Sequence, residues 1–150
     1  MVNEIMDAVT RRLGVLFGDE AVIYTDRVEQ GLVEPCFFVS VMEPSRKPML
    51  GRRSFQETGF CIQYIPEESK MDKSRELNQV ADTLFDGMEY INLANGDALR
   101  GTGRSFRTED GVLNFFVSYN MYLMAPAEAV DAMGELKWKG GTGSGSETKQ

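Results

Sequence analysis

The chain has 150 residues, enough for one domain, and its 42% hydrophobic and 26% charged residues are typical of a soluble globular protein. Its formal net charge of −7 argues against a dedicated nucleic-acid-binding protein, which would need a basic surface to release phosphate counterions. No apolar run approaches the roughly 20 residues of a membrane span, and the N-terminus lacks the apolar core of a signal peptide. We therefore expect no membrane contact and a chain that stays in the cytoplasm in which it is made.

The first predicted element is an amphipathic helix over residues 2–17. Its apolar residues fall on one arc of the helix, with Asn3 placed to cap the start and Gly18 placed to end it. The apolar arc consists of Val2, Ile5, Met6, Val9, Leu13, Leu16 and Phe17. A single apolar stripe of this kind predicts a helix that packs on a sheet.

Three strands are predicted next, over residues 21–25, 36–42 and 54–65. They are rich in β-branched and aromatic residues, and 36–42 is apolar on both faces, which is typical of a central or doubly covered strand. Between the last two strands, residues 43–53 (EPSRKPMLGRR) contain two prolines and a glycine. Because proline and glycine interrupt regular structure, this segment is predicted to be a long hairpin loop.

A second amphipathic helix is predicted over residues 72–86, with Gly87 in the position of a left-handed C-terminal residue. A brief strand over 89–93 follows. Asn95 and Gly96 then form the dipeptide that is typical of a type I′ hairpin turn. The pattern therefore predicts that the chain reverses here into another strand.

The last two predicted strands cover residues 98–108 and 113–123 and are joined by a turn at Asp110 and Gly111. In the final strand, apolar and mixed residues alternate with a period of two, so one face is predicted to lie in the core. The apolar face consists of Leu113, Phe115, Val117, Tyr119, Met121 and Leu123, and the mixed face of Asn114, Phe116, Ser118, Asn120 and Tyr122.

The order α-β-β-β-α-β-β-β predicts an α+β domain over residues 1–124. Two helices with one apolar stripe each can cover one face of a mostly antiparallel sheet, giving a two-layer sandwich. Residues 125–139 are predicted to be a C-terminal extension, either a short helix or without regular structure. The Gly/Ser-rich residues 140–150 are predicted to be a flexible tail.

The residues of common catalytic and metal sites are sparse. The chain has no histidine, which removes the usual general base and metal ligand, and its two cysteines lie in apolar strand-like runs. Cys36 and Cys61 are expected to be reduced core thiols, with a disulfide between neighbouring strands as the alternative. No phosphate-binding loop is present, and Gly101 and Gly103 are best explained as hairpin glycines. We expect no catalytic residue, cofactor or metal ion.

With no catalytic or metal site expected, the features left to explain function are exposed surfaces that could bind another protein. The two-sided strand at 36–42, the mixed face of 113–123 and nine methionines predict more apolar area than two helices can cover, unless the aromatic residues simply pack in the core. The basic residues of 43–53 form either a solvated loop tip or a docking surface for an acidic partner or nucleic acid. These residues are Arg46, Lys47, Arg52 and Arg53.

Several segments together resemble the tail terminator (tail-completion) proteins of phages and prophages of Gram-positive bacteria. They are NEIxDAxxxxL in the first helix, IYT, VEQGLVEPCFFVSVMEPSRKPMLGRR, QYIP, ELNQVADTLFDGMEYI, LRGT and DGVLNFFVSYNMYL, spread over residues 2–124. The resemblance implies a structural, non-enzymatic virion protein with an α+β fold. It implies a ring, typically a hexamer, that caps the head-proximal end of the tail tube, stops tube polymerisation and presents the attachment surface for the neck and head.

The partners implied by this resemblance are further copies of the chain, the tail tube protein and a neck or head-completion protein, with DNA only passing through the ring. Closure of the ring would use surplus apolar strand surface. The residues that we expect at interfaces are Arg46, Lys47, Arg52, Arg53, Glu29, Gln30, Leu32, Glu34, Phe116 and Tyr122. The alternatives are another head–tail joining or tail tube protein of similar fold, and, more remotely, a small binding module or enzyme.

Overall fold

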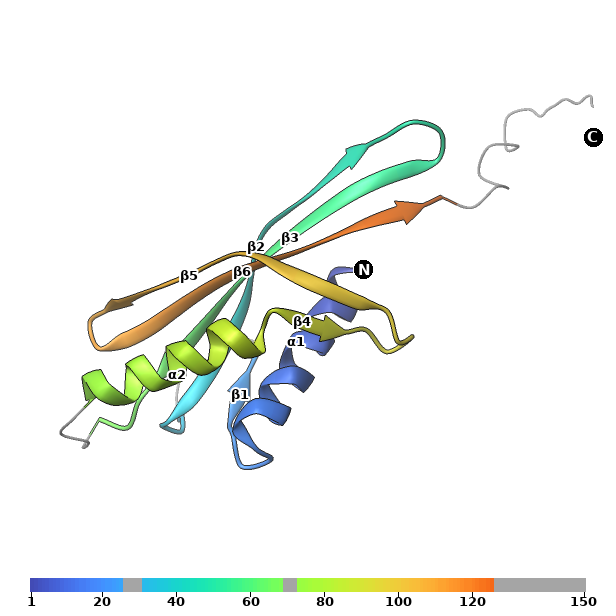
Figure 1. Ribbon diagram of the computed structural model, residues 1–150. Coiled ribbons are helices and arrows are strands. Elements are labelled where there is room, and N and C mark those ends of the chain that lie inside the picture. Colours follow the sequence, from blue (N-terminus) through green and yellow to red (C-terminus); the bar gives the residue numbers. More distant parts are fainter. Residues whose placement is uncertain (26–30, 69–72, 126–150) are drawn as a thin grey trace, which may run out of the picture. The chain divides into compact units, whose positions relative to one another are not determined.

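The structure is a computed structural model that describes residues 1–25, 31–68 and 73–125. Within these ranges the chain forms two helices and six strands, in the predicted order (Figure 1). They are α1 (Val2–Phe17), β1 (Ile23–Tyr24), β2 (Cys36–Pro48), β3 (Arg53–Ile65), α2 (Lys73–Gly87), β4 (Tyr90–Asn92), β5 (Ala98–Glu109) and β6 (Val112–Met124). The α+β class is confirmed, whereas the two-layer sandwich and the domain boundary at residue 124 stay predictions.

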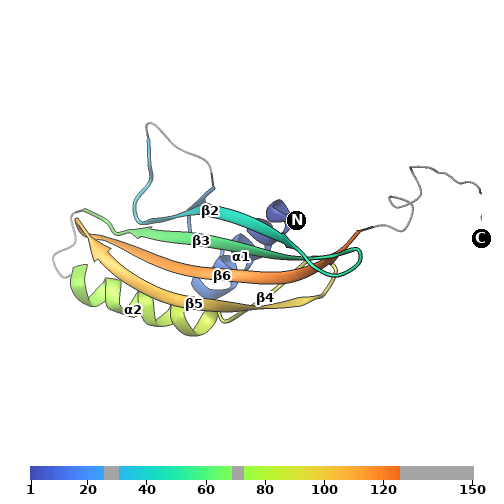
Figure 2. The ribbon, with the colours of Figure 1, turned by 90° about the horizontal axis from the view of Figure 1, so that it is seen from above.

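The six strands form one mostly antiparallel sheet in the order β1-β2-β3-β6-β5-β4, and Figure 2 shows β2, β3, β6 and β5 side by side. The short strand β1 runs parallel to β2, pairing Ile23 with Phe37. On the other side, β4 and β6 both pair with β5 in antiparallel fashion. Strand β6, for which the sequence predicts one apolar face in the core, therefore lies inside the sheet between β3 and β5.

The described chain divides into two compact units. The first, called the main unit, contains residues 1–45 and 57–121 and includes both helices. The second, called the hairpin unit, contains residues 46–56, where β2 turns into β3, together with the end of β6 from Tyr122 onward.

The core of the main unit is built from the apolar stripes that the sequence predicts. Ile5, Val9 and Leu13 of α1 are fully buried, as are Leu113, Phe115 and Tyr119 of β6. The predicted face of β3 is also confirmed, since its alternate residues are all buried. These residues are Phe60, Ile62 and Tyr64. Period-two and helical patterns therefore located the core correctly because each element buries a single face.

Two glycines in the main unit lie where a side chain would meet close neighbours. A Cβ atom on Gly87 would lie 2.5 Å from the Leu16 side chain, and one on Gly101 would lie 2.7 Å from the Met88 carbonyl oxygen. Gly87 is the last residue of α2 and does not have the positive φ that was predicted for it. Gly87 therefore lies where α1 approaches α2, and the atoms that its Cβ would meet are the movable methyl groups of Leu16.

The predicted loop at 43–53 is wrong, because β2 continues to Pro48 and β3 begins at Arg53. Proline cannot donate a hydrogen bond in a sheet but is tolerated where the edge of a strand is open. Among the described residues, β1 pairs with β2 only at Phe37 and Phe38, so the later part of that edge has no such partner strand. Pro44 and Pro48 can therefore lie within the strand.

Two further local predictions need correction. Asn3 does not cap α1, whose N-cap residue is Met1 without a side-chain cap. At Asn95 and Gly96 only the glycine has a positive φ, and five residues separate the paired ends of β4 and β5. The turn is instead closed by hydrogen bonds within those five residues, so it is not type I′.

The other predicted turn, between β5 and β6, has type I′ character. Asp110 and Gly111 both have a positive φ, of 52° and 75°, and directly link the paired residues Glu109 and Val112. The cysteines are free thiols, Cys36 buried and Cys61 half-buried, in agreement with the sequence. The predicted C-terminal helix and Gly/Ser tail fall among residues 126–150, outside the described residues.

Candidate functional site

The hairpin unit ends in a tight turn that presents apolar side chains to solvent. The Met49 N–H donates to the Arg53 carbonyl oxygen at 2.9 Å, and Gly51 provides the positive φ of 69° that the turn requires. Leu50 is 92% exposed and Met49 is 40% exposed. We call Met49 and Leu50 the hairpin tip. A leucine that is almost wholly solvated gains nothing from folding, so its burial remains available to a partner.

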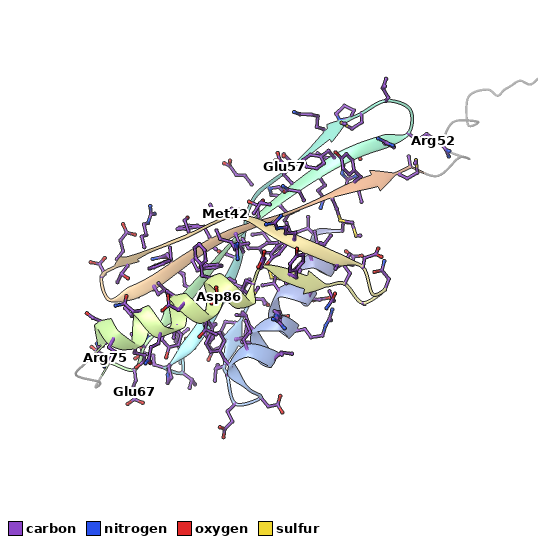
Figure 3. All side chains as sticks on the ribbon, in the orientation of Figure 1. Met42, Arg52, Glu57, Glu67, Arg75 and Asp86 are labelled. Atoms are coloured by element: carbon purple, nitrogen blue, oxygen red, sulfur yellow. The ribbon has the colours of Figure 1, made fainter. Side chains whose placement is uncertain are left out.

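The four predicted basic residues surround this tip and are all exposed. Figure 3 shows Arg52 at the turn end of the hairpin. The Arg46 guanidinium donates to the Gln56 side-chain oxygen at 2.8 Å, and the Arg53 guanidinium lies 5.8 Å from the centre of the Tyr122 ring. Cation–π contacts and hydrogen bonds of this kind orient the arginines without neutralising them. The tip is therefore an apolar point within a positively charged rim.

Tyr122 is 61% exposed and belongs to the hairpin unit, where its ring lies 5.0 Å from that of Phe55. Phe116 belongs to the main unit, is half-buried and is covered by the Arg107 guanidinium at 5.3 Å from the ring centre. The structure thus assigns the two aromatic residues of the mixed β6 face to different units. Tyr122 supports the charged rim of the tip, and Phe116 does not.

The mixed face of β6 is not uniformly open. Asn114 is only 7% exposed, and its side-chain oxygen accepts a hydrogen bond from the Gln63 amide at 2.8 Å. Gln56 and Thr58 on β3 are buried as well. Buried polar groups of this kind need internal partners, and alternation of residue type in the sequence does not indicate that burial.

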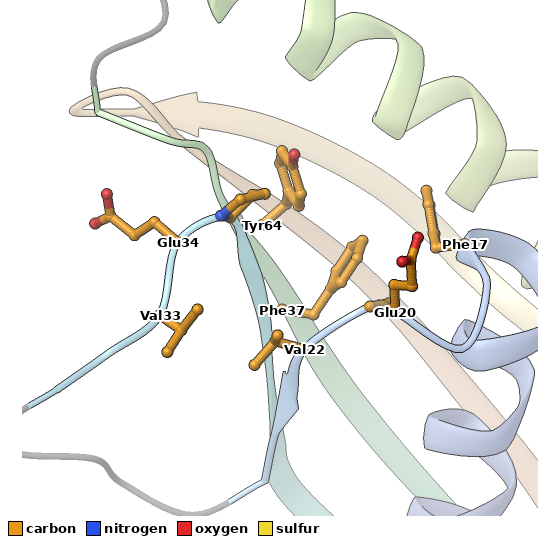
Figure 4. Close-up of a pocket in the computed structure, with 9 residues that line it drawn as sticks. Phe17, Glu20, Val22, Val33, Glu34, Phe37 and Tyr64 are labelled. Atoms are coloured by element: carbon orange, nitrogen blue, oxygen red, sulfur yellow. The ribbon is translucent and has the colours of Figure 1, made fainter.

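The main unit contains a pocket of about 410 Å³ next to the start of β2 (Figure 4). Its lining is mostly apolar and comes from the end of α1, the region of β1, the start of β2 and the end of β3. The lining residues are Phe17, Glu20, Ala21, Val22, Val33, Glu34, Pro35, Phe37 and Tyr64. The volume is within the range of about 300–1,000 Å³ that is usual for pockets that bind small groups.

Three aromatic rings give the pocket its apolar character. The Phe17 and Phe37 ring centres are 4.6 Å apart, and those of Phe37 and Tyr64 are 5.0 Å apart. The Tyr64 hydroxyl donates to a carboxylate oxygen of Glu76. Burial, reinforced by this carboxylate, raises the pKa of Tyr64 above its usual range, so the phenol remains neutral at physiological pH.

Two exposed carboxylates, Glu20 and Glu34, lie at the rim of the pocket. The Glu34 side chain accepts a hydrogen bond from the Glu68 N–H at 3.2 Å, which orients one of its oxygens. With no basic residue in its lining, the pocket is a concave apolar site with a negative rim. It suits an apolar group that is flanked by positive charge.

The predicted interface residues therefore fall into two groups. Arg46, Lys47, Arg52, Arg53 and Tyr122 lie in the hairpin unit, whereas Leu32, Glu34 and Phe116 lie in the main unit; Glu29 and Gln30 lie outside the described residues. Sequence reasoning did not single out Leu50 or the aromatic lining of the pocket. The exposed Met-Leu pair between basic residues could have indicated the tip, but no local pattern connects Phe17 with Tyr64.

The described residues contain no group of three or more acidic, cysteine or histidine side chains that could hold a metal ion. Burial raises the pKa of both Cys36 and Cys61, which disfavours the reactive thiolate form. Neither described helix is long and apolar enough to span a membrane. What the described residues offer most clearly is a pair of exposed or concave surfaces suited to protein contacts.

These features describe a small α+β protein with two candidate surfaces for protein contacts. The chain belongs to the phage tail terminator protein family, whose model matches residues 4–131. No curated protein matches the chain. A solved structure whose title is only a sequence identifier is similar at 16% identity, with a TM-score of 0.45, over 84% of this chain and 98% of the other. Membership of the family assigns the chain to the phage tail and to virion assembly, with other tail or head proteins as partners.

Proposed function

We propose that this protein forms a hexameric ring that caps the head-proximal end of the tail tube. The ring ends polymerisation of the tube and provides the surface to which the neck and head attach. The family match over residues 4–131 carries this proposal, because it covers most of the chain rather than one motif. The protein acts structurally in this role and uses no cofactor.

The two surfaces described above support assembly into a ring. Closed rings are built from heterologous contacts, in which two different surfaces of one subunit meet on neighbouring copies. The chain offers two such surfaces of opposite character, the hairpin tip with its basic rim and the acidic-rimmed pocket. The net charge of −7 suits a channel through which DNA passes without binding.

The test is electron microscopy of phage particles made in host cells with and without this protein. Tails assembled without it are expected to be overlong and not joined to heads, and supplying the protein should restore their normal length. Light scattering of the purified protein should give the mass of about six subunits, alone or when tube ends are added. Long filaments of the purified protein would instead indicate a tube protein, and normal tails in its absence would overturn the proposal.

A further inference from the structure

We propose that the hairpin tip of one copy inserts into the acidic-rimmed pocket of the next copy. This inference rests on the proposed ring and names the contact that builds it. Leu50, with Met49 beside it, is the apolar group that enters the pocket. The surrounding arginines then face Glu20 and Glu34 at the rim of the receiving copy.

The tip has the properties of an interface anchor. Leu50 is 92% exposed although it is a large aliphatic residue, and it stands at the end of a tight turn that a hydrogen bond closes. A rigid turn loses little conformational freedom on binding, so more of the burial energy of its side chain appears as affinity. An exposed leucine between charged residues is a common arrangement at the centre of a contact, where an apolar core is surrounded by a polar rim.

The pocket matches the tip in apolar character and in charge. Its lining includes the rings of Phe17, Phe37 and Tyr64, and its volume of about 410 Å³ leaves room for an aliphatic side chain. Glu20 and Glu34 at the mouth carry the charge opposite to that of Arg52 and Arg53. Opposite charges at the rim of a contact fix its orientation and speed the encounter.

The placement of the two surfaces in separate units has a consequence for assembly. Each copy carries one tip and one pocket, so each can donate to one neighbour and receive from another. Heterologous contacts of this kind continue from copy to copy until the chain of subunits closes into a ring. Two copies that exchange tips would instead form a closed dimer, and the mass of the wild-type assembly distinguishes the two.

The first experiment replaces Leu50 by aspartate and measures assembly by light scattering and by electron microscopy of tail ends. Val15→Asp is the matched control, because Val15 is also aliphatic and is 68% exposed, on α1. We expect L50D to weaken subunit association at least tenfold, with an unchanged circular dichroism spectrum, and V15D to assemble like the wild type. Rings of L50D at wild-type concentrations would overturn the inference.

The second experiment tests the charge match by mixing variants. A tip variant, R52E with R53E, and a pocket variant, E20K with E34K, should each fail to form rings alone. Mixed together, they should form rings in which the two variants alternate, because the intact tip meets the intact pocket and the reversed tip meets the reversed pocket. A chain that carries all four reversals should recover rings. Recovery in neither case, with folded proteins, would contradict the charge match.

The third experiment uses crosslinking to identify what occupies the pocket. Val33 lines the pocket and is 54% exposed, so a chain with V33C and L50C can report on the contact when it is oxidised. We expect a ladder of linked copies on a denaturing gel, whereas either single variant should give none beyond the wild-type background. A link within one chain, or a link to the tube protein instead, would overturn the inference.

The two proposals fail differently. If the wild-type protein forms no ring on tail ends, the proposed function fails and the contact fails with it. If wild-type rings form and L50D rings form equally well, the ring stands and only this contact is wrong.

Discussion

Removal of the Tyr119 hydroxyl should destabilise the main unit by a predictable amount. Tyr119 is fully buried, and its hydroxyl donates to the Met88 carbonyl oxygen at 2.6 Å. The ring itself lies in the core, with its centre 6.2 Å from that of Phe60. Tyr119→Phe keeps the ring and its packing while it removes the donor. The variant therefore isolates one buried hydrogen bond that links β6 to the segment after α2.

The expected cost follows from the buried acceptor that remains. A carbonyl oxygen that loses its partner away from water costs about 1–3 kcal/mol. With a midpoint of about 2 kcal/mol and a shift of about 2–4 °C per kcal/mol for a chain of this size, Tm should fall by about 4–8 °C. The control is Tyr90→Phe, because Tyr90 is 54% exposed and the same atom is removed in solvent. Its free energy of unfolding should change by less than about 0.5 kcal/mol.

Urea unfolding followed by circular dichroism gives the free energy of unfolding for the wild type and both variants. The slope with urea should be the same for all three proteins, so that the difference in midpoint reports stability alone. A Tyr119→Phe protein as stable as Tyr90→Phe would refute the argument. That result would mean that the Met88 carbonyl finds another donor or that the hydroxyl bond contributes nothing net.

Three further outcomes are expected. Burial raises the pKa of Tyr64 and Tyr119 above the usual 10.0, so the unfolded chain loses these protons at a lower pH than the folded protein. The stability that these groups contribute is therefore fully present below about pH 10 and should decrease as pH rises further. Urea unfolding at several pH values should show this decrease, and it should be shallower in Tyr119→Phe. Gly101→Ala should lower the free energy of unfolding by about 1–3 kcal/mol, because its Cβ would lie 2.7 Å from a backbone oxygen. In Gly96→Ala, by contrast, the Cβ meets no atom within 4 Å, and the only strain comes from the φ of 97°. Equal stability of Gly101→Ala and wild type in thermal unfolding would contradict this expectation. Phe60→Ala should lower the free energy of unfolding by about 3–5 kcal/mol in urea, because Phe60 is fully buried and leaves a cavity, and a loss below about 1 kcal/mol would show that the core collapses around it.

Much of the secondary structure was predictable because each element buries one face. The bounds of α1 agree with the predicted helix at both ends, and β6 agrees within one residue. The type I′ turn at Asp110 and Gly111 also follows from sequence, since both residues tolerate a positive φ and directly connect two alternating strands. Asn95 and Gly96 carry the same signal, but pairing of β4 with β5 leaves a five-residue connection, which no local pattern fixes.

The candidate surfaces were predictable only in part. The basic residues of 43–53 led to the prediction of a contact surface, which stays a prediction. The strand structure of this segment was missed because the prolines look like breaks until the open edge of β2 is known. Glu34 was predicted to lie at an interface, but the sequence did not predict the pocket that it lines. Leu50 was overlooked because an apolar residue in a loop becomes informative only when its exposure is known.

The sequence by itself determined the order of the elements, the faces that form the core and the family to which the chain belongs. Those properties depend on residues that are near one another along the chain, where periodicity and motif spacing are visible. Only the tertiary structure decided that β2 runs through its prolines, that Gly87 lies next to Leu16, and that Phe17, Phe37 and Tyr64 meet in a pocket rimmed by Glu20 and Glu34. These depend on which segments pack against each other, and packing between distant segments leaves no periodic trace in the chain.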